Sequence, residues 1–265
     1  MRIIGIIPAR YASSRLPGKP LVDIHGKPMI WWVWKAAKQV VELDEVYIAT
    51  DDERIRTIVE AFGGEVVMTS DCATGTDRVA EVSMKITADR YVVINGDEPT
   101  IKSEDIRAVA LETSSGDKAL IVLCFAVQEP IDVINPTIHK FALNERNEVI
   151  YISRSSIPFP QAEFEYDLHK CVGVYCYPRN LLKWFTQTPI GRLERIESSD
   201  LLRLVENRVP IKAVITKNQS FSVDTLKDLK RVTNILTPPP DIQYRSSQWL
   251  RYSCGASSFY KWRVA

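Results

Sequence analysis

The sequence predicts an α/β fold in which a mostly parallel sheet is flanked by helices. The first observation is an alternation, over residues 2–94, of short β-branched apolar runs with segments whose apolar residues repeat at helical spacing. Short links join these segments, as expected when crossover helices connect parallel strands. The second observation is that 45% of the 265 residues are hydrophobic and 25% are charged, which is enough apolar material to bury a full core.

The elements of the N-terminal half follow one another in a regular order. The first strand ends in a Pro-Ala-Arg loop, and Pro28 suits the first turn of the first long helix. The second helix has Thr50 as its expected N-cap, followed by acidic residues in its first turn. We expect strands over 2–7, 45–49, 65–68 and 90–94, and helices over 28–41, 50–62 and 77–87.

The pattern changes in the C-terminal half, where a hairpin is expected. Residues 138–143 and 149–153 are short strands separated by the turn residues 144–147. Further strands are expected over 119–127, 170–177, 211–215 and 220–223, and helices over 179–186, 194–207 and 226–236. We therefore predict one domain over 1–236, with a Rossmann-like parallel core and a smaller antiparallel insertion at about 125–190. Residues 237–265, which begin with Thr-Pro-Pro-Pro and continue as a basic, aromatic tail, form a C-terminal extension.

The charge and cysteine content exclude several classes of protein. The chain has 34 basic and 33 acidic side chains, so its net charge of +1 gives no electrostatic reason to expect nucleic acid as a partner. The longest apolar runs, such as 119–127, have the length of a strand, so we predict no membrane span, and the N-terminus lacks the pattern of a cleavable signal. Five scattered cysteines without a C-x-x-C pair indicate reduced thiols and a cytoplasmic location.

A basic loop follows the first strand, at the edge of the sheet where open α/β folds bind ligands. The string from Ile7 to Pro20 reads IPARYASSRLPGKP. Its small residues let backbone N–H groups approach an anion, and Arg10, Arg15 and Lys19 add positive charge. It is not a Walker loop, because Pro20 follows Gly-Lys, and the sequence contains no G-x-G-x-x-G. We predict an anion-binding loop.

Two acidic segments follow short strands and are candidate metal ligands. The strand 90–94 leads through Asn-Gly to Asp97 and Glu98, and Asp224 follows the expected strand 220–223. Magnesium binds oxygen ligands and keeps several waters, so one or two carboxylates plus substrate phosphates suffice. Taken alone, Asp224 is more often a helix cap or a turn residue. Two acids opposite a basic loop favour a Mg²⁺ site.

Together these strings resemble the family of CMP-KDO synthetases, the 3-deoxy-manno-octulosonate cytidylyltransferases. The resemblance covers about 1–236 and leaves the rest of the chain outside it. The matching strings are, in chain order, IIPARYASSRLPGKPL, GKPMI, ATDDERI, TGTDRVAE, NGDEP, YISRSSIP, GVYCY and SVDTLKDL.

The resemblance implies a nucleotidyltransferase fold and a Mg²⁺-dependent, cytoplasmic homodimer, in which the insertion at about 125–190 would serve dimerisation or substrate binding. Its reaction would transfer CMP from CTP to the anomeric hydroxyl of a 3-deoxy-2-keto sugar acid, KDO or a close variant. Pyrophosphate would leave, and the CMP-sugar would serve the synthesis of lipopolysaccharide or another cell-surface polysaccharide. Carried over by motif, the catalytic residues would be Lys19, Asp97 and Asp224, the nucleotide-binding residues Arg10, Ser13, Lys19, Arg78 and Asn95, and the Mg²⁺ ligands Asp97 and Asp224.

Several positions depart from the family pattern. The family usually has Gln where this chain has Asn95, on the nucleotide side. On the sugar side, the strand before Gly-x-Tyr normally carries a histidine, where this chain has Cys171. His169 shares a face with Cys171, because side chains alternate along a strand, and we expect it to substitute in part. The family's Glu-Gln pair ahead of Leu-Arg appears here as Asp200-Leu201.

The resemblance also assigns the sugar site. Arg154, which would clamp the carboxylate of the sugar acid, and Tyr175 are retained, and we place Cys171 and Asp200 beside them. One interpretation is that the nucleotide half is kept while the acceptor half is retuned toward an amino or deoxy variant of the sugar acid. The other is sequence drift without a change in specificity.

Two further interpretations remain open. Another sugar nucleotidyltransferase, of the CMP-sialic-acid type or acting on a sugar phosphate, would also use Arg10, Lys19 and Asp97. Arg154 together with Asp224 favours a sugar acid. The second interpretation is a non-catalytic binding subunit that recruits a partner through its basic tail. The intact Lys19, Asp97 and Asp224 argue against it, since a relaxed site should lose them first.

Overall fold

The strands of the N-terminal half form a parallel sheet. The computed structural model describes residues 1–13, 15–113, 118–162 and 167–239. Strand β1 (Ile3–Pro8) lies between β6 (Arg90–Ile94) and β4 (Glu45–Thr50), and β5 (Glu65–Met68) pairs with β4 at the edge. The strands predicted for this half are confirmed, each to within one residue at its ends.

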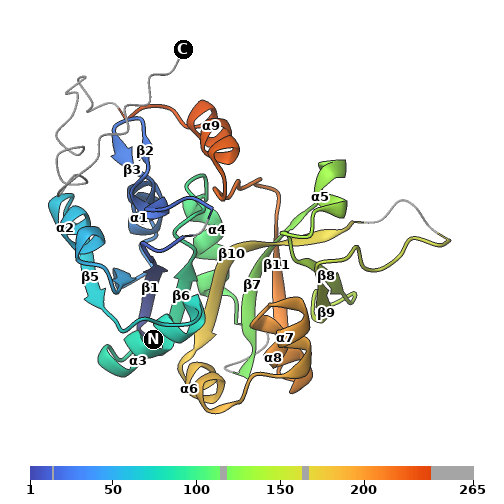
Figure 1. Ribbon diagram of the computed structural model, residues 1–265. Helices are drawn as coiled ribbons and strands as arrows, with labels where there is room; N and C mark the ends of the chain where they lie inside the picture. The colour runs from blue at the N-terminus through green and yellow to red at the C-terminus, as the bar shows by residue number, and fades with distance from the viewer. Residues whose placement is uncertain (14, 114–117, 163–166, 240–265) are drawn as a thin grey trace.

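The sheet continues into the C-terminal half with an inverted strand. Strand β10 (His169–Pro178) pairs antiparallel with β6 on one side and with β7 (Leu120–Ala126) on the other, and β11 (Ile211–Thr216) is parallel to β7. The strand order is β11-β7-β10-β6-β1-β4-β5 (Figure 1). The predicted mostly parallel sheet is therefore confirmed, with β10 running against its neighbours.

The predicted hairpin is also confirmed. Strands β8 (Lys140–Leu143) and β9 (Val149–Ser153) pair antiparallel around a turn in which Asn147 adopts a φ of 57°. Strand β8 also pairs with the start of β10, so the hairpin branches from the main sheet, on the same side as the short helix α5 (Pro130–Ile134) (Figure 1). The segment 125–190 thus contributes β10 to the main sheet as well as the hairpin beside it.

Helices cover both faces of the sheet because alternate residues of each strand point to opposite faces. Ile7 and Val92 lie in an apolar cluster with α1, α2 and α4, whereas Ile6 and Val93 lie in a second cluster with α3, α6 and α8. These helices are α1 (Met29–Lys38), α2 (Glu53–Ala61), α3 (Gly75–Lys85), α4 (Ser103–Leu111), α6 (Arg179–Gln187) and α8 (Leu201–Glu206). The result is a three-layer α/β/α arrangement.

The remaining elements lie around this core. The 3₁₀ helix η1 (Lys19–Leu21) leads into a small two-stranded ribbon of β2 (Asp23–Ile24) and β3 (Lys27–Pro28). Helix α7 (Arg192–Glu197) precedes α8, and α9 (Leu226–Ile235) packs its Val232 with residues of α1 and the ribbon. Helix α9 therefore brings the C-terminal part of the described chain back to the loop that follows β1.

The predicted strand 220–223 is wrong, because this segment is irregular. The amide of Phe221 donates to Thr100 Oγ1 at 2.8 Å, and the amide of Val223 donates to the carbonyl of Asp97 at 2.9 Å. The backbone of this segment thus binds the loop that follows β6 instead of entering a sheet.

Other boundaries also differ from the prediction. The helix expected over 194–207 is divided into α7 and α8 at Ser198, whose φ is 50°. Helix α2 is capped by Asp52, which accepts from the amide of Arg54 at 2.9 Å, and not by Thr50, which still belongs to β4. Helix α4 was not predicted; Ile106, Val109 and Ala110 form its buried face.

In the described part of the chain, no helix is long and apolar enough to cross a membrane. From residue 240 onward, the predicted C-terminal extension lies outside the described residues.

A buried ion pair between α7 and α8 gives a prediction for stability. Arg203 donates to Glu194 from Nε to Oε2 at 2.7 Å and from Nη2 to Oε1 at 2.6 Å, and both residues are buried. Glu194→Gln leaves the guanidinium without a counter-charge, so we expect the free energy of unfolding to fall by about 3 kcal/mol in urea denaturation. Glu60→Gln, on the exposed side of α2, should leave it almost unchanged. Equal losses in the two variants would contradict this account.

Candidate functional site

The site begins where β1 and β6 end side by side. The loop after β1 and the Asn95-Gly96-Asp97 turn after β6 emerge at the same edge of the sheet, because the two strands are parallel. Gly96 passes close to the end of β1: a Cβ at this position would lie 3.1 Å from the carbonyl oxygen of Pro8. The amide of Asn95 donates to the carbonyl of Gly173 on β10 at 2.7 Å. The turn is thereby held between two strands.

Lys19 joins the two acids that the sequence singled out. Its Nζ lies 2.6 Å from Asp97 Oδ2 and 3.1 Å from Asp224 Oδ1. Burial lowers the pKa of Lys19, but the charges and hydrogen bonds of Asp97 and Asp224 outweigh burial, so the pKa is raised overall. Lys19 is therefore a fixed cation between two carboxylates. Gly18, with a φ of 68°, makes the turn that places it there.

Asp224 is held in place without capping a helix. Its neighbour Thr225 caps α9 in a capping box with Asp228, and Asp224 itself extends toward Lys19. Arg15 donates from Nη2 to Asp224 Oδ1 at 3.1 Å. The alternative that Asp224 serves as a helix cap is thus wrong, and its carboxylate takes part in the site.

This arrangement fits the ligand preferences of Mg²⁺. Among the residues that the structure describes, no group of three or more His, Cys, Asp or Glu side chains could hold a metal ion. Asp97 and Asp224 share one counter-cation and are each about 30% exposed, with side-chain values of 28% and 31%. Two accessible carboxylates with the remaining ligands from phosphate and water match the usual protein contribution to a Mg²⁺ site.

One cavity, of about 270 Å³, lies between the basic loop and the start of α3. Arg78 of α3 lines it and is almost fully buried, with Nη2 3.1 Å from Asp51 Oδ1 and further bonds to Thr69 and the carbonyl of Ser70. Of the residues predicted to bind nucleotide, the structure brings all to this cavity: Arg10, Ser13, Lys19, Arg78 and Asn95.

The basic loop is clamped from outside. The guanidinium of Arg54 stacks 3.3 Å from the centre of the Tyr11 ring, and Asp52 binds the same guanidinium. Tyr11 also packs against Gly18, where an added Cβ would lie 3.3 Å from the ring. The carbonyl of Tyr11 also accepts from the amide of Gly18 at 3.1 Å. These contacts restrict the loop before any anion binds.

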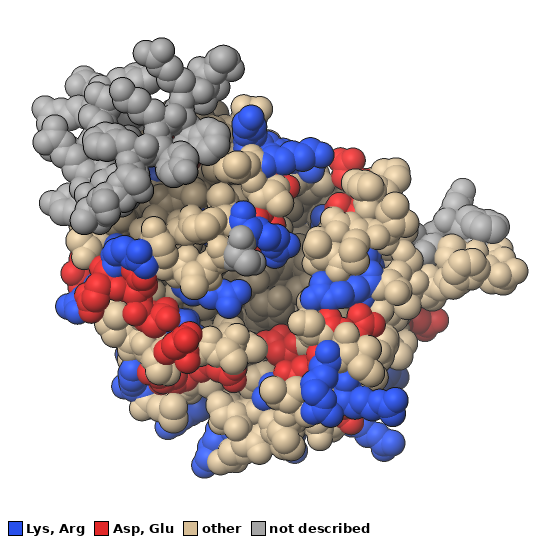
Figure 2. Space-filling view, in the orientation of Figure 1, with Lys and Arg blue, Asp and Glu red and all other residues tan. Residues whose placement is uncertain are grey.

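A second cavity, of about 460 Å³, adjoins the first and shares Arg15, Asn95, Asp97 and Asp224 with it. Figure 2 shows a hollow near the centre of this face of the molecule, with basic and acidic side chains around it. The cations that line the second cavity are Arg15, Lys170 and Arg231, and the acids are Asp97, Glu98, Asp132, Asp224 and Asp228. A lining with charges of both signs suits a polar ligand.

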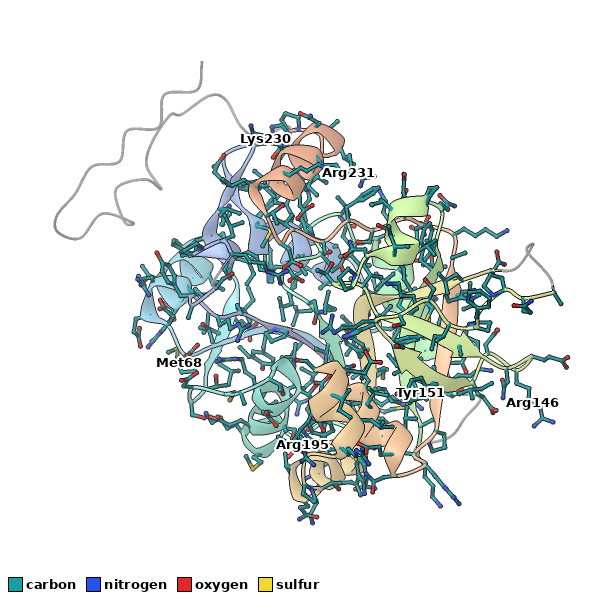
Figure 3. The ribbon with its side chains drawn as sticks, turned by 45° about the vertical axis from the view of Figure 1, so that its right-hand side comes forward. Met68, Arg146, Tyr151, Arg195, Lys230 and Arg231 are labelled. Carbon is teal, nitrogen blue, oxygen red and sulfur yellow. The ribbon has the colours of Figure 1, made fainter. Side chains whose placement is uncertain are left out.

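All three of these cations are already paired, Arg15 with Asp224 as described above. Lys170 lies 2.6 Å from Asp132 Oδ2. Arg231 reaches from α9 toward the side of α5 (Figure 3), where its Nη2 lies 3.7 Å from Glu129 Oε1 and its guanidinium stacks over Phe221. Neither Lys170 nor Arg231 was predicted from the sequence, since isolated cations carry no pattern that separates them from surface residues.

Glu98 lies at the wall of the second cavity and is buried. It accepts from Ser220 Oγ at 2.6 Å. Burial and the neighbouring charge of Asp97 raise the pKa of Glu98 to about 7. Its hydrogen bond with Ser220 joins the loop after β6 to the segment that carries Asp224.

Cys171 and Tyr175, predicted for the sugar site, both line the second cavity. The Cys171 sulfur lies 3.2 Å from the Tyr175 hydroxyl. Burial raises the pKa of Cys171 to about 12, so this side chain is a neutral thiol at physiological pH.

Arg154 and Asp200, predicted for the same site, are not among the residues that line the two cavities. Arg154 donates to the carbonyls of Glu197, Ser198 and Pro136 at 2.6, 3.1 and 2.8 Å. Its role as a carboxylate clamp stays a prediction.

Asp200 immediately precedes α8 and accepts from Thr76 Oγ1 at 2.7 Å. Leu201, beside it, belongs to the apolar cluster of α3, α6 and α8. The departure at Leu201 is therefore a change in the hydrophobic core, which the linear sequence did not reveal.

Sequence reasoning also missed His139. It lines the second cavity, whereas His169, the expected substitute for an imidazole at position 171, does not. The register of the predicted hairpin against the next strand was the signal that could have placed His139 opposite Cys171.

The chain is similar to known proteins of one family. Residues 4–213 match the family model of cytidylyltransferases. The chain is 41% identical over 234 residues to the 3-deoxy-manno-octulosonate cytidylyltransferase of Escherichia coli, a match that covers 87% of this chain and 94% of that protein. It is 40% identical over 237 residues to the 8-amino-3,8-dideoxy-manno-octulosonate cytidylyltransferase of Shewanella baltica strain OS195, covering 87% and 97%.

A solved structure is similar along almost its whole length. CMP:2-keto-3-deoxy-manno-octonic acid synthetase complexed with CTP matches with a TM-score of 0.84 at 38% sequence identity, covering 89% of this chain and 98% of that chain. The predicted nucleotidyltransferase-like fold is confirmed by this match.

The half-buried carboxyl group of Asp200 gives a prediction for the pH dependence of stability. Burial raises the pKa of Asp200 above its ordinary value of 3.8, although the bond from Thr76 acts against it. The folded chain then holds a proton more tightly than the unfolded chain, so this residue's contribution to stability is lost as the pH rises through its folded pKa.

Asp200→Asn removes this titration. We expect the free energy of unfolding of the wild type, relative to that of the variant, to increase as the pH falls toward 4, measured by urea denaturation at several pH values. A difference that does not vary with pH would refute the assignment.

Proposed function

This chain belongs to the cytidylyltransferase family, and we propose that it transfers CMP from CTP to the anomeric hydroxyl of 3-deoxy-manno-octulosonate or a close variant, releasing pyrophosphate. The observation that carries the proposal is the contact of Lys19 with both Asp97 and Asp224, at the junction of two cavities. A nucleotide in one cavity and an acceptor in the other would meet at these three side chains.

In this proposal the smaller cavity takes CTP. Arg10, Ser13 and Lys19 would hold the phosphates, and Arg78, fixed by Asp51, would keep its wall in place. The protein has little covalent chemistry to perform, because alignment of the two substrates and neutralisation of charge account for most of the catalysis of such transfers. The clamped loop supports this role, since it presents its charges without reorganisation.

Asp97 and Asp224 would hold Mg²⁺. When bound, the metal would stabilise negative charge on the phosphates and lower the pKa of the attacking hydroxyl. Lys19 keeps the two carboxylates together and adds a positive charge at the same point. Arg15 adds a second positive charge beside Asp224.

The larger cavity takes the sugar acid. Its cations, Arg15, Lys170 and Arg231, offer charge to a carboxylate, and its polar wall suits hydroxyl groups. The relatives named above act on 3-deoxy-manno-octulosonate in one case and on its 8-amino-3,8-dideoxy variant in the other. Both acids therefore belong in the test.

The proposal includes a cytoplasmic homodimer that makes an activated CMP-sugar for lipopolysaccharide or another cell-surface polysaccharide. The cysteines of the described residues, Cys72, Cys124, Cys171 and Cys176, are free, which is compatible with a reducing compartment.

Pyrophosphate release tests the proposed function. The purified full chain is assayed with CTP and Mg²⁺ against 3-deoxy-manno-octulosonate, its 8-amino analogue, neuraminic acids and a hexose 1-phosphate. We expect release with one of the two octulosonates. Release only with a neuraminic acid or the hexose phosphate would replace the proposed acceptor, and no release with any of them would refute the reaction.

The metal ligands give a separate prediction. Asp97→Asn and Asp224→Asn remove one charge each from the site, and we expect each to lower kcat by at least about a hundredfold at saturating Mg²⁺. The melting temperature should change little, because both side chains are partly exposed. Glu60→Gln serves as the control for a lost surface charge. A rate near that of the wild type in either variant would exclude that residue as a metal ligand.

A further inference from the structure

His139 lies directly opposite Cys171 at the wall of the larger cavity. The pairing of β8 with β10 sets Phe141 against His169 and Lys140 against Lys170, and the next position in this register sets His139 against Cys171. The amide of Cys171 donates to the carbonyl of His139 at 3.1 Å, which confirms the register. Side chains directly opposite each other on antiparallel strands share a face, with their Cβ atoms about 5 Å apart.

The imidazole of His139 has an unused polar atom. Its Nε2 is buried and has no hydrogen-bond partner among the described residues. Of the described residues that line the two cavities, His139 is the one with such an atom. A buried nitrogen without a hydrogen-bond partner costs free energy. Since this nitrogen lies at a cavity wall, we infer that a polar group of the bound ligand is its partner.

The imidazole is neutral at physiological pH. Burial, together with the charges of Arg154 and Lys140, lowers the pKa of His139 to about 4, although Glu197 acts in the opposite direction. A neutral imidazole has one nitrogen that donates and one that accepts. It is therefore suited to a hydroxyl group, whereas the cations of the cavity are suited to a carboxylate.

We propose that His139 determines acceptor specificity by hydrogen-bonding a hydroxyl group of the sugar acid in the larger cavity. The inference rests on the proposed function for the identity of the acceptor. Because the ring borders the cavity while its Nε2 is covered, binding includes a rotation about χ2, a torsion with broad preferences in histidine. The neighbouring Cys171 thiol and Tyr175 hydroxyl complete a neutral polar wall beside it.

Three substitutions test this role. His139→Phe keeps a planar ring and removes both nitrogens, and His139→Gln restores a donor and an acceptor. His169→Phe is the matched control, since His169 lies two residues before Cys171 on the same strand but does not line the cavity. For each variant, KM for the octulosonate, KM for CTP, kcat and the melting temperature are measured.

We expect His139→Phe to raise KM for the sugar acid about tenfold, the loss of one hydrogen bond, without changing KM for CTP. His139→Gln should recover part of this loss. The melting temperature of His139→Phe should stay the same or rise, because an unpaired polar group has been replaced by an apolar ring. The control should match the wild type. An unchanged KM for the sugar acid, or equal increases in both KM values together with a lower melting temperature, would show a purely structural histidine.

A binding measurement keeps the inference separate from the proposed reaction. The chain has three histidines, His25, His139 and His169, so ¹⁵N labelling of histidine gives few imidazole signals, and His139→Phe assigns the one of interest. Each acid of the panel and the hexose 1-phosphate is titrated in turn. A shift of the His139 signal supports its contact with the acceptor even if no pyrophosphate is released and the proposed reaction fails. No shift with any of these probes would overturn the inference.

Discussion

Strands β1 and β6 lie side by side in parallel register, from Ile3 with Arg90 to Ile6 with Val93, and the arrangement of the site depends on this pairing. It brings the basic loop and the Asn95–Asp97 turn to one edge, although they are about eighty residues apart in the chain. The approach is close enough that Gly96 has little room for a side chain beside the carbonyl of Pro8. Lys19 can contact Asp97 because Lys19 comes after β1, Asp97 comes after β6, and these two strands end at the same edge of the sheet.

The second acid comes from the far end of the described chain. Asp224 is positioned by a hydrogen bond from the amide of Val223 to the carbonyl of Asp97 and by the docking of α9 on α1. The carboxylates of Asp97 and Asp224 repel each other because both contact the same ammonium group and so lie close together. Lys19 supplies the opposite charge that holds them together. A preorganised set of charges lowers the cost of assembling nucleotide, metal and acceptor, because less reorganisation accompanies binding.

The two cavities differ in how far the sequence predicted them. The residues assigned to the nucleotide all line the smaller cavity, because they occur in contiguous strings that follow strands of a parallel sheet. The assignment of the sugar side was less complete. Cys171 and Tyr175 line the larger cavity, but Leu201 packs in the core, and His139 and Arg231 come from segments whose position depends on the hairpin and on α9.

Local sequence was sufficient to predict the alternating strands and helices, the hairpin and the chemistry of the basic loop with its two acids, because each of these follows from local periodicity or from a contiguous motif. Only the folded chain showed that 220–223 is not a strand, that β10 enters the sheet between β6 and β7, and that His139, not His169, borders the larger cavity. These features depend on pairing between segments distant in the chain. Register and contact across such pairs are set by packing, which no local pattern specifies.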